Sequence, residues 1–285
     1  MKATKEKVED VKAQENNIPE QLELREIKKL SDDYIIDDET YFADNMYVTN
    51  SMLKTLLTGS TYNLEHYINS EHKETESLIV GSAFHCYLLE RDEFDSRYVY
   101  EPKFDKRTKA GKEAYAEFEK TLDGRKPIPE HYQQVFETIM KRLDSHDNAR
   151  EMIKDAPDRE VIHFWEDVKT GLKCKGKVDA EGKNYLLDIK TTSKKADMVS
   201  FQKYATDYML AQQAAFYING TGKKDFYFIL FELKAPYNIA VYKMSDNAIS
   251  YGSAYVDMTL NMYKEWKDSG ESWKQHLNAG RIILV

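Results

Sequence analysis

The sequence predicts an α/β fold in which a mixed central β-sheet is flanked by helices. Apolar residues in the first half of the chain recur at helical spacing, whereas short apolar strands bounded by turn residues follow Pro157. Helical patterns and strands then alternate to residue 268. The chain has 285 residues, 41% of them hydrophobic, which is enough for a large core.

The first half is expected to be helical. Thr49, Asn50 and Ser51 offer side chains that can cap a short helix ending near residue 57. Apolar positions 79, 80, 83, 84, 87 and 88 indicate a buried helix over 76–89. Further helices are expected over residues 61–69, 109–121 and 129–155, with Pro129 as the first residue of the last one.

Strands dominate the next part of the chain. Three strands over 161–165, 172–180 and 185–189 are separated by Gly171 and by the turn 181–184, which predicts an antiparallel meander. The remaining elements are expected to be a helix over 197–219, strands over 226–233 and 239–242, and a helix over 246–268.

Composition gives the predicted domain limits. Residues 1–28 are highly charged and are expected to form a flexible tail, and 271–285 a C-terminal tail. Residues 29–270 are expected to form a single domain, with a helical part over 45–155 and a sheet core over 158–268.

Several classes of protein are disfavoured. No apolar run approaches the roughly 18–20 residues that span a bilayer, and the N-terminus lacks a signal peptide's apolar stretch, so a cytoplasmic protein without membrane contact is expected. Two cysteines, Cys86 and Cys174, cannot hold an iron–sulfur cluster or a four-cysteine zinc site. A net charge of −8 argues against a non-specific DNA coat, but not against an enzyme with a local basic groove.

The segment from Asp179 to Lys190 carries the clearest chemical signal. Asp179 ends one strand and Asp188 lies on the next, so the two carboxylates can face each other across an antiparallel pair. They would repel unless a cation joined them, and Mg²⁺ or Mn²⁺ prefers such oxygen ligands. Lys190 shares a strand face with Asp188, and the carbonyl of Ile189 can reach the same point. This set suits metal-assisted phosphodiester hydrolysis.

The alternative interpretation of this segment is a solvent-facing hairpin with salt bridges. Leu186 and Leu187 argue against it, because they make Asp188 part of a buried strand where an unpaired charge is costly.

Four distant residues are candidates for the same site, each with a structural alternative. His85 is either a metal ligand or a core histidine, and Glu160 either supports the metal or is an isolated carboxylate. Gln213 and Tyr217 lie four residues apart on one helix face, where they either orient DNA and the lysine or form a half-buried polar pair.

Taken in order, these motifs resemble those of the RecB-type PD-(D/E)xK nucleases. The likeness is strongest to the C-terminal nuclease domain of RecE (exodeoxyribonuclease VIII) and its phage relatives, and it covers about residues 45–265. The matching segments are Tyr47-Val-Thr-Asn-Ser51-Met-Leu53, Gly81-Ser-Ala-Phe-His85, Arg107-Thr-Lys-Ala-Gly-Lys112, Glu160, Gly176-Lys-Val-Asp179, Asp188-Ile-Lys190 and Gln213-x-x-x-Tyr217.

The resemblance implies a restriction-endonuclease-like core and a role for each matching residue. Asp179, Asp188, His85 and the carbonyl of Ile189 would ligate Mg²⁺, for which Mn²⁺ can substitute, and Lys190 would be the catalytic lysine. Glu160, Gln213 and Tyr217 would complete the catalytic set. Two positions depart from the family pattern: Val178 replaces a common proline, and Lys175 and Lys177 stand where arginine is more usual.

The resemblance also implies a substrate and partners. It implies 5′→3′ digestion of one strand from the ends of linear double-stranded DNA, in the cytoplasm of a bacterial host that carries a phage or prophage. A RecT-type annealing protein and a homo-oligomeric ring, trimer or tetramer, are implied partners. DNA ends would enter a groove lined by Arg107, Lys109, Lys112, Thr191, Lys194 and Lys195. The alternative interpretation is that these residues form ordinary solvated surface.

The sequence is also compatible with two competing functions. The first is an endonuclease of the same fold. The second is a module of that fold which has lost catalysis and binds DNA or a partner. The intact Asp179, Asp188 and Lys190 argue against the second, because a binding module has no need to keep buried like charges together.

Overall fold

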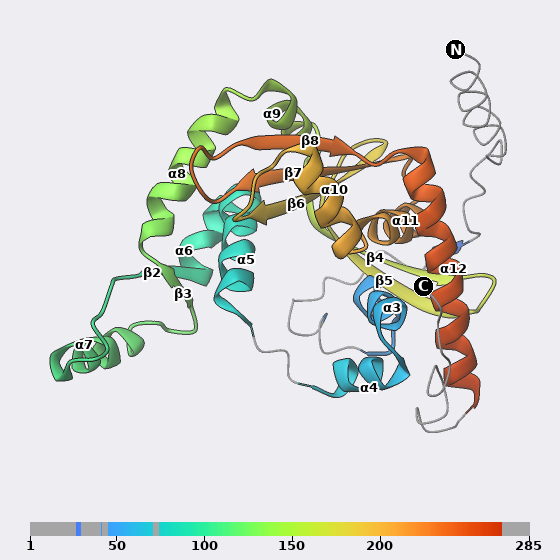
Figure 1. Ribbon diagram of the computed structural model, residues 1–285, viewed down its shortest axis with the longest axis horizontal. Coiled ribbons are helices and arrows are strands. Elements are labelled where there is room, and N and C mark those ends of the chain that lie inside the picture. The colour runs from blue at the N-terminus through green and yellow to red at the C-terminus, as the bar shows by residue number, and fades with distance from the viewer. Residues whose placement is uncertain (1–26, 30–40, 42–44, 71–73, 270–285) are drawn as a thin grey trace, which may run out of the picture.

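The computed structural model describes residues 27–29, 41, 45–70 and 74–269. Within these ranges a six-stranded sheet, in the order β1-β4-β5-β6-β7-β8, forms the centre of the molecule (Figure 1). All neighbouring strands are antiparallel except β6 and β7, so the predicted mixed sheet is confirmed. The strands are β1 (Ile27–Lys29), β4 (Asp158–Asp167), β5 (Leu172–Glu181), β6 (Tyr185–Thr192), β7 (Asp225–Glu232) and β8 (Ile239–Lys243).

Helices cover both faces of the sheet (Figure 1). On one face, Leu186, Phe226 and Phe228 pack with α3 (Asn50–Thr58), α11 (Leu210–Thr221) and α12 (Asp246–Ser269). On the other face, the intervening residues Leu187, Ile189 and Ile229 pack with α5 (Glu76–Leu89), α8 (His131–Asp144) and α9 (Asp147–Lys154). Alternate residues of β6 and β7 therefore enter two separate cores, as the strand period of two requires.

The helices of the first half begin where capping side chains allow. Thr49 caps α3, Ser60 caps α4 (Thr61–Asn69) and Thr75 caps α5, each by accepting a hydrogen bond from a backbone N–H three residues later. The expected helices over 61–69 and 76–89 are confirmed at both ends. The short elements η1 (Arg91–Glu93) and α6 (Phe94–Arg97) follow α5.

The prediction that Pro129 opens a helix is wrong. Pro129 ends β3 (Lys126–Pro129), which pairs in parallel with β2 (Tyr98–Glu101), and α8 begins two residues later. Pro127 and Pro129 each bias the preceding residue towards extended backbone, and this favours a strand over a helix. Between β2 and β3 the chain makes an excursion that carries α7 (Lys109–Glu119), which projects from the body of the molecule (Figure 1).

Two predicted long helices are each broken in two. The helix expected over 129–155 is interrupted at Ser145 and His146, where the His146 side chain accepts a hydrogen bond from the N–H of Ala149 and starts α9. The helix expected over 197–219 divides into α10 (Met198–Asp207) and α11, because Met209 between them adopts a left-handed backbone with φ of 54°. Together α10 and α11 form the crossover that the parallel pair β6–β7 needs.

The described residues test the predicted limit of the N-terminal tail but not that of the C-terminal tail. Ile27 and Lys28, placed in the N-terminal tail by composition, belong to β1 and pair with β4. Residues 1–26 and the whole of the predicted C-terminal tail, 271–285, lie outside the described residues. No described helix is both long and apolar enough to span a membrane.

Candidate metal and nuclease site

Three neighbouring strands each bring one carboxylate to the same place. Continuing the β4–β5 and β5–β6 registers sets Glu160 and Asp188 opposite Asp179. The β5–β6 ladder itself has only two residue pairs, and it stops next to Asp179. There the backbone N–H of Ile189 donates to Asp179 Oδ2 at 2.6 Å. The side-chain carboxylate thus accepts a hydrogen bond in place of a backbone carbonyl. The acidic residues therefore gather where two strands separate.

Helix α5 adds a nitrogen ligand to this group. His85 Nδ1 lies 3.5 Å from Asp179 Oδ2. One ligand atom each from His85, Glu160 and Asp179 lie within 4.8 Å of one another, which makes these residues a group that could hold a metal ion. Glu160 has a left-handed backbone with φ of 49°, a conformation that costs energy in a residue with a side chain and is concentrated at functional sites.

The chemistry of these donors fits a divalent cation. Burial raises the pKa of Asp179, and burial followed by the charge of Asp179 raises the pKa of Glu160. Like charges that are partly removed from water repel each other, so a cation between them relieves an unfavourable arrangement. Burial, and then the charge of Lys190, lower the pKa of His85, so that the ring is neutral near pH 7 and can ligate a metal. A nitrogen and several carboxylate oxygens suit Mn²⁺, and Mg²⁺ binds the oxygens.

Asp188 and Lys190 form an ion pair beside this group. Lys190 Nζ lies 2.5 Å from Asp188 Oδ2, and it donates to Asp188 Oδ1 at 2.8 Å. The Gln213 side-chain amide, from α11, donates to Asp188 Oδ1 as well. Burial raises the pKa of Asp188 to about 6, although Lys190 lowers it. Burial alone would lower the pKa of Lys190, but Asp188 and Asp179 outweigh this and raise it, so the amine is charged at neutral pH.

The other predicted site residues on β6 and α11 are also next to this centre. The Ile189 side chain is fully buried in the core against α5. The Ile189 backbone lies close enough to the His85 ring to favour its protonated form, although burial and the charge of Lys190 outweigh this effect and lower the pKa of His85. Tyr217 lines the cleft and its ring lies against Gly176, where an added Cβ would come within 2.5 Å of Tyr217 Cε1.

One residue was not assigned to the site from the sequence. Lys177 lies 2.7 Å from a carboxylate oxygen of Glu160 and so fixes that side chain. The period of two along β5 could have identified it, because Lys177 and Asp179 share a strand face.

The structure divides the predicted DNA-binding residues into two groups. Arg107 and Lys109 are almost fully exposed at the start of α7, where they pair with Asp105 and Glu113, and Lys112 follows on the same helix. This helix projects away from the sheet that carries the carboxylates (Figure 1). The other group is nearer. Thr191 lies on β6 directly after Lys190, and Lys194 and Lys195 are exposed in the loop that follows β6.

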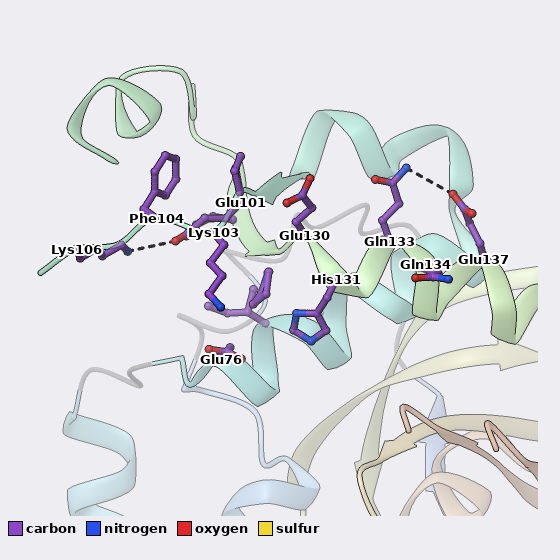
Figure 2. A pocket seen from close by; sticks show the side chains of 14 residues that line it. Glu76, Glu101, Lys103, Phe104, Lys106, Glu130, His131, Gln133, Gln134 and Glu137 are labelled. Carbon is purple, nitrogen blue, oxygen red and sulfur yellow. Dashed lines mark hydrogen bonds and ion pairs between the residues drawn. The ribbon is translucent and has the colours of Figure 1, made fainter. Parts of the chain in front are cut away.

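Two cavities in the described part of the molecule bear on the choice of site. A cleft of about 590 Å³ is lined by four of the predicted site residues, His85, Glu160, Asp179 and Tyr217. A larger cavity of about 860 Å³ lies between α5, β2, β3 and α8, and its lining includes Glu76, Glu130 and His131 but none of the predicted site residues (Figure 2). The smaller cleft is therefore the candidate active site.

Comparison with solved structures supports the fold. A crystal structure of a "Putative exonuclease" from Eubacterium rectale matches with a TM-score of 0.60 at 16% sequence identity, covering 88% of this chain and 97% of that chain. A second solved structure, that of SSO0001, is 13% identical over 81% of this chain and 96% of that one, but its TM-score of 0.26 is too low to indicate a shared fold. No curated protein sequence matches the chain.

Comparison with family models identifies the family. The model described as "PDDEXK-like domain of unknown function (DUF3799)" matches residues 49–279, most of the chain. This confirms the predicted membership of the PD-(D/E)xK superfamily and its fold class, while the particular likeness to RecE stays a prediction. The chain belongs to the family of this PDDEXK-like domain.

Proposed function

We propose that this protein is a divalent-metal-dependent nuclease that degrades linear double-stranded DNA from its ends. The observation that carries the proposal is the meeting of His85, Glu160 and Asp179 within 4.8 Å, beside a lysine that is paired with Asp188. Carboxylates and a lysine around one point are the groups that metal-assisted phosphodiester hydrolysis requires.

The metal would be held by His85, Glu160 and Asp179, with Asp188 and the carbonyl of Ile189 as neighbouring oxygen donors. When bound, Mg²⁺ or Mn²⁺ would supply Lewis-acid stabilisation of negative charge on the phosphate. Asp188 also anchors Lys190, so the same carboxylate connects the metal group and the lysine.

The protein's own residues have distinct roles in this proposal. Lys190 remains an ammonium at neutral pH and so stabilises charge that develops on the phosphate during hydrolysis. Gln213 donates to Asp188 and keeps that carboxylate oriented towards Lys190. Burial raises the pKa of Tyr217 well above its ordinary value, so its hydroxyl remains protonated and acts as a hydrogen-bond donor or a packing group, not as a base.

Action at DNA ends is supported by two likenesses. The similar structure from Eubacterium rectale carries the name of an exonuclease. The motifs resemble those of RecE, for which the expected action is 5′→3′ digestion that leaves single strands for recombination by strand annealing. We extend this to a RecT-type annealing partner, a homo-oligomeric ring and action in the bacterial cytoplasm, all as parts of the proposal.

The proposal is tested with linear duplex DNA labelled at the 5′ or the 3′ end and, in parallel, with closed circular duplex DNA, each with and without Mg²⁺. We expect metal-dependent loss of the 5′ label from linear DNA and an intact circle. Rapid cutting of the circle would show an endonuclease instead. No cleavage of either form, combined with tight binding, would show a module without catalysis.

A further inference from the structure

Lys54, on α3, occupies an unusual position for a surface lysine. It is half-buried, and its Nζ lies 4.8 Å from the centroid of the Tyr208 ring, at the end of α10. No carboxylate among the described residues pairs with it within the distance of a salt bridge. A lysine that gives up part of its hydration without an acidic partner is costly. The contact with the aromatic ring compensates for only part of that cost.

The charge of Lys190 also acts on Lys54. Burial lowers the pKa of Lys54, and the nearby positive charge of Lys190 lowers it further. Asp188 does not relieve this repulsion, because its carboxylate already holds Lys190 and the Gln213 amide. Lys54 lies on the helix whose first turn lines the cleft, because Asn50 and Ser51 belong to the same lining as Asp179. An anion bound beside Lys54 and Lys190 would offset the repulsion between their charges.

The local backbone is arranged to present Tyr208 to Lys54. Tyr208 is 50% exposed, and its ring lies 4.5 Å from that of Tyr204, one turn earlier. The next residue, Met209, has the left-handed backbone that ends α10 and starts α11. Strained residues of this kind persist where the surrounding structure holds them, and they concentrate at functional sites. Helix α3 is in turn joined to α11 by a hydrogen bond from the Gln212 amide to Asn50 Oδ1, at 3.5 Å.

We propose that Lys54, held against Tyr208, binds a backbone phosphate of the DNA strand on the Lys190 side of the carboxylates. The site takes a phosphodiester group, because the ligand must be an anion and must belong to the substrate of the neighbouring centre. Lys54 is then a phosphate-binding residue that positions the strand for Lys190. This inference rests on the proposed function, and it adds a contact that the Asp179–Lys190 segment does not contain.

Loss of one phosphate contact has a characteristic signature. The logarithm of the affinity falls linearly with the logarithm of salt concentration, and each phosphate contact contributes about 0.9 to that slope on duplex DNA. Lys54→Gln should therefore weaken binding and make the slope shallower by roughly 0.9. Lys54→Arg should keep the slope, because it keeps the charge. Tyr208→Phe should behave like the unmodified protein and Tyr208→Ala like a weakened one, because only the aromatic face matters.

The experiment measures binding of a short fluorescein-labelled DNA duplex by anisotropy, with Ca²⁺ in place of Mg²⁺, over a range of KCl concentrations. Lys264→Gln is the matched control, since Lys264 is an exposed lysine on α12 that is paired with Asp268. Thermal unfolding checks that each variant is folded. A slope reduced in Lys54→Gln, and unchanged in Lys54→Arg and Lys264→Gln, supports the site.

Failure of this inference and failure of the proposed function give different results. An unchanged salt slope in folded Lys54→Gln overturns the phosphate site, whatever the nuclease activity. If the salt slope is reduced in Lys54→Gln but the unmodified protein does not hydrolyse DNA in Mg²⁺, the phosphate site stands and the nuclease proposal is overturned. Absence of DNA binding by the unmodified protein overturns both.

Discussion

Asp188 connects the metal group, the lysine and α11 through the two oxygens of one carboxylate. Lys190 reaches both oxygens, and the Gln213 amide donates to Oδ1. Asp188 is only 4% exposed, so water contributes little to stabilising its charge. A buried charge of this kind is tolerated when it is paired and hydrogen-bonded, and the site meets both conditions at the expense of stability.

Because burying the Asp188 charge is unfavourable, the stability of the metal-free protein is expected to depend on pH. Burial raises the pKa of Asp188 from its ordinary 3.8 to about 6. A shift of this size changes the free energy of unfolding by roughly 3 kcal/mol across the titration of the group. The folded state therefore binds the proton more tightly than the unfolded state. The stabilising contribution is fully present below pH 3.8 and is lost as the pH rises through about 6.

We expect Asp188→Asn to cancel this dependence. In EDTA, the free energy of unfolding of the unmodified protein should fall relative to that of the variant as the pH rises from about 4 to about 7. Urea unfolding across this range measures it, and Asp92→Asn, an exposed site, is the control. The ion pair with Lys190 exists only while Asp188 is ionised, so it is already included in the pKa of about 6, and the difference in slope between the two curves is the result. Parallel curves would contradict the pKa shift.

Gln213 is expected to act through Asp188. Gln213→Ala should lower kcat by roughly 10- to 100-fold with little change in KM, as is typical when a group that orients a ligand is removed. Steady-state digestion of linear DNA measures this, and Gln202→Ala, an exposed glutamine on α10, is the control. Equal activity of the two variants would show that the Gln213 contact has no positioning role.

The sequence located part of this site and could not locate the rest. Asp179, Asp188 and Lys190 lie on one hairpin, so the strand period and the register of an antiparallel pair were enough to bring them together. The meeting of His85 with Glu160 depends on how α5 packs on the sheet and on the left-handed backbone at Glu160. Neither leaves a local pattern, so the residues alone left His85 and Glu160 as candidates with a structural alternative each, and the family resemblance favoured the functional one.

At the scale of elements, the contact between α11 and α12 controls the placement of Gln213 and Tyr217. Gly252 lies at a close approach of the two helices, since an added Cβ would come within 2.0 Å of the Ala211 carbonyl oxygen. That neighbour is backbone of α11, so the contact could be relieved only by moving one helix. A close approach of this kind requires glycine.

Gly252→Ala is therefore expected to destabilise the protein, against simple helix propensity. Alanine favours a helix interior over glycine by about 1 kcal/mol, whereas forcing extra volume into a packed contact costs about 1–3 kcal/mol. We expect a lower urea midpoint and a loss of nuclease activity as α11 shifts, whereas Ser253→Ala should leave both unchanged. A more stable Gly252→Ala variant would show that α12 can move at no cost.

Most elements followed from hydrophobic periodicity, and the exceptions have local causes. The strands of the meander and the helices α3, α4 and α5 were expected near their observed bounds, because apolar spacing and capping residues agreed there. The break at Met209 was not predictable, because methionine is a good helix former and nothing in its type favours a left-handed backbone. The pair of strands β2 and β3 was not predicted, because a proline such as Pro129 is common both at the start of a helix and in an edge strand.

At the scale of the whole molecule, the site joins the two halves of the chain. His85 comes from α5 in the helical first half, and the carboxylates come from the sheet core. A metal ion bound by this group should therefore stabilise the entire fold, since it would bind the folded state and not the separated segments.

Metal is expected to raise the melting temperature. At a concentration 100 times Kd, Mn²⁺ would add about 2.7 kcal/mol to the free energy of unfolding, which corresponds to a rise in Tm of roughly 5–10 °C for a domain of this size. Thermal unfolding with Mn²⁺ or EDTA measures the shift, which Asp179→Asn should reduce and the exposed Asp92→Asn should retain. The same shift in Asp179→Asn would place the metal elsewhere.

The central claim is that Lys190 and its carboxylates form a metal-dependent nuclease centre, and the most direct test is the rate at which nucleotides are released from linear duplex DNA in Mg²⁺. Folded Lys190→Ala is compared with the unmodified protein and with Lys264→Ala, which changes an exposed lysine on α12. We predict that Lys190→Ala loses roughly 10²- to 10³-fold in rate, that Lys264→Ala loses none, and that EDTA abolishes release in all three. Undiminished release by Lys190→Ala, with its fold intact, would contradict the claim.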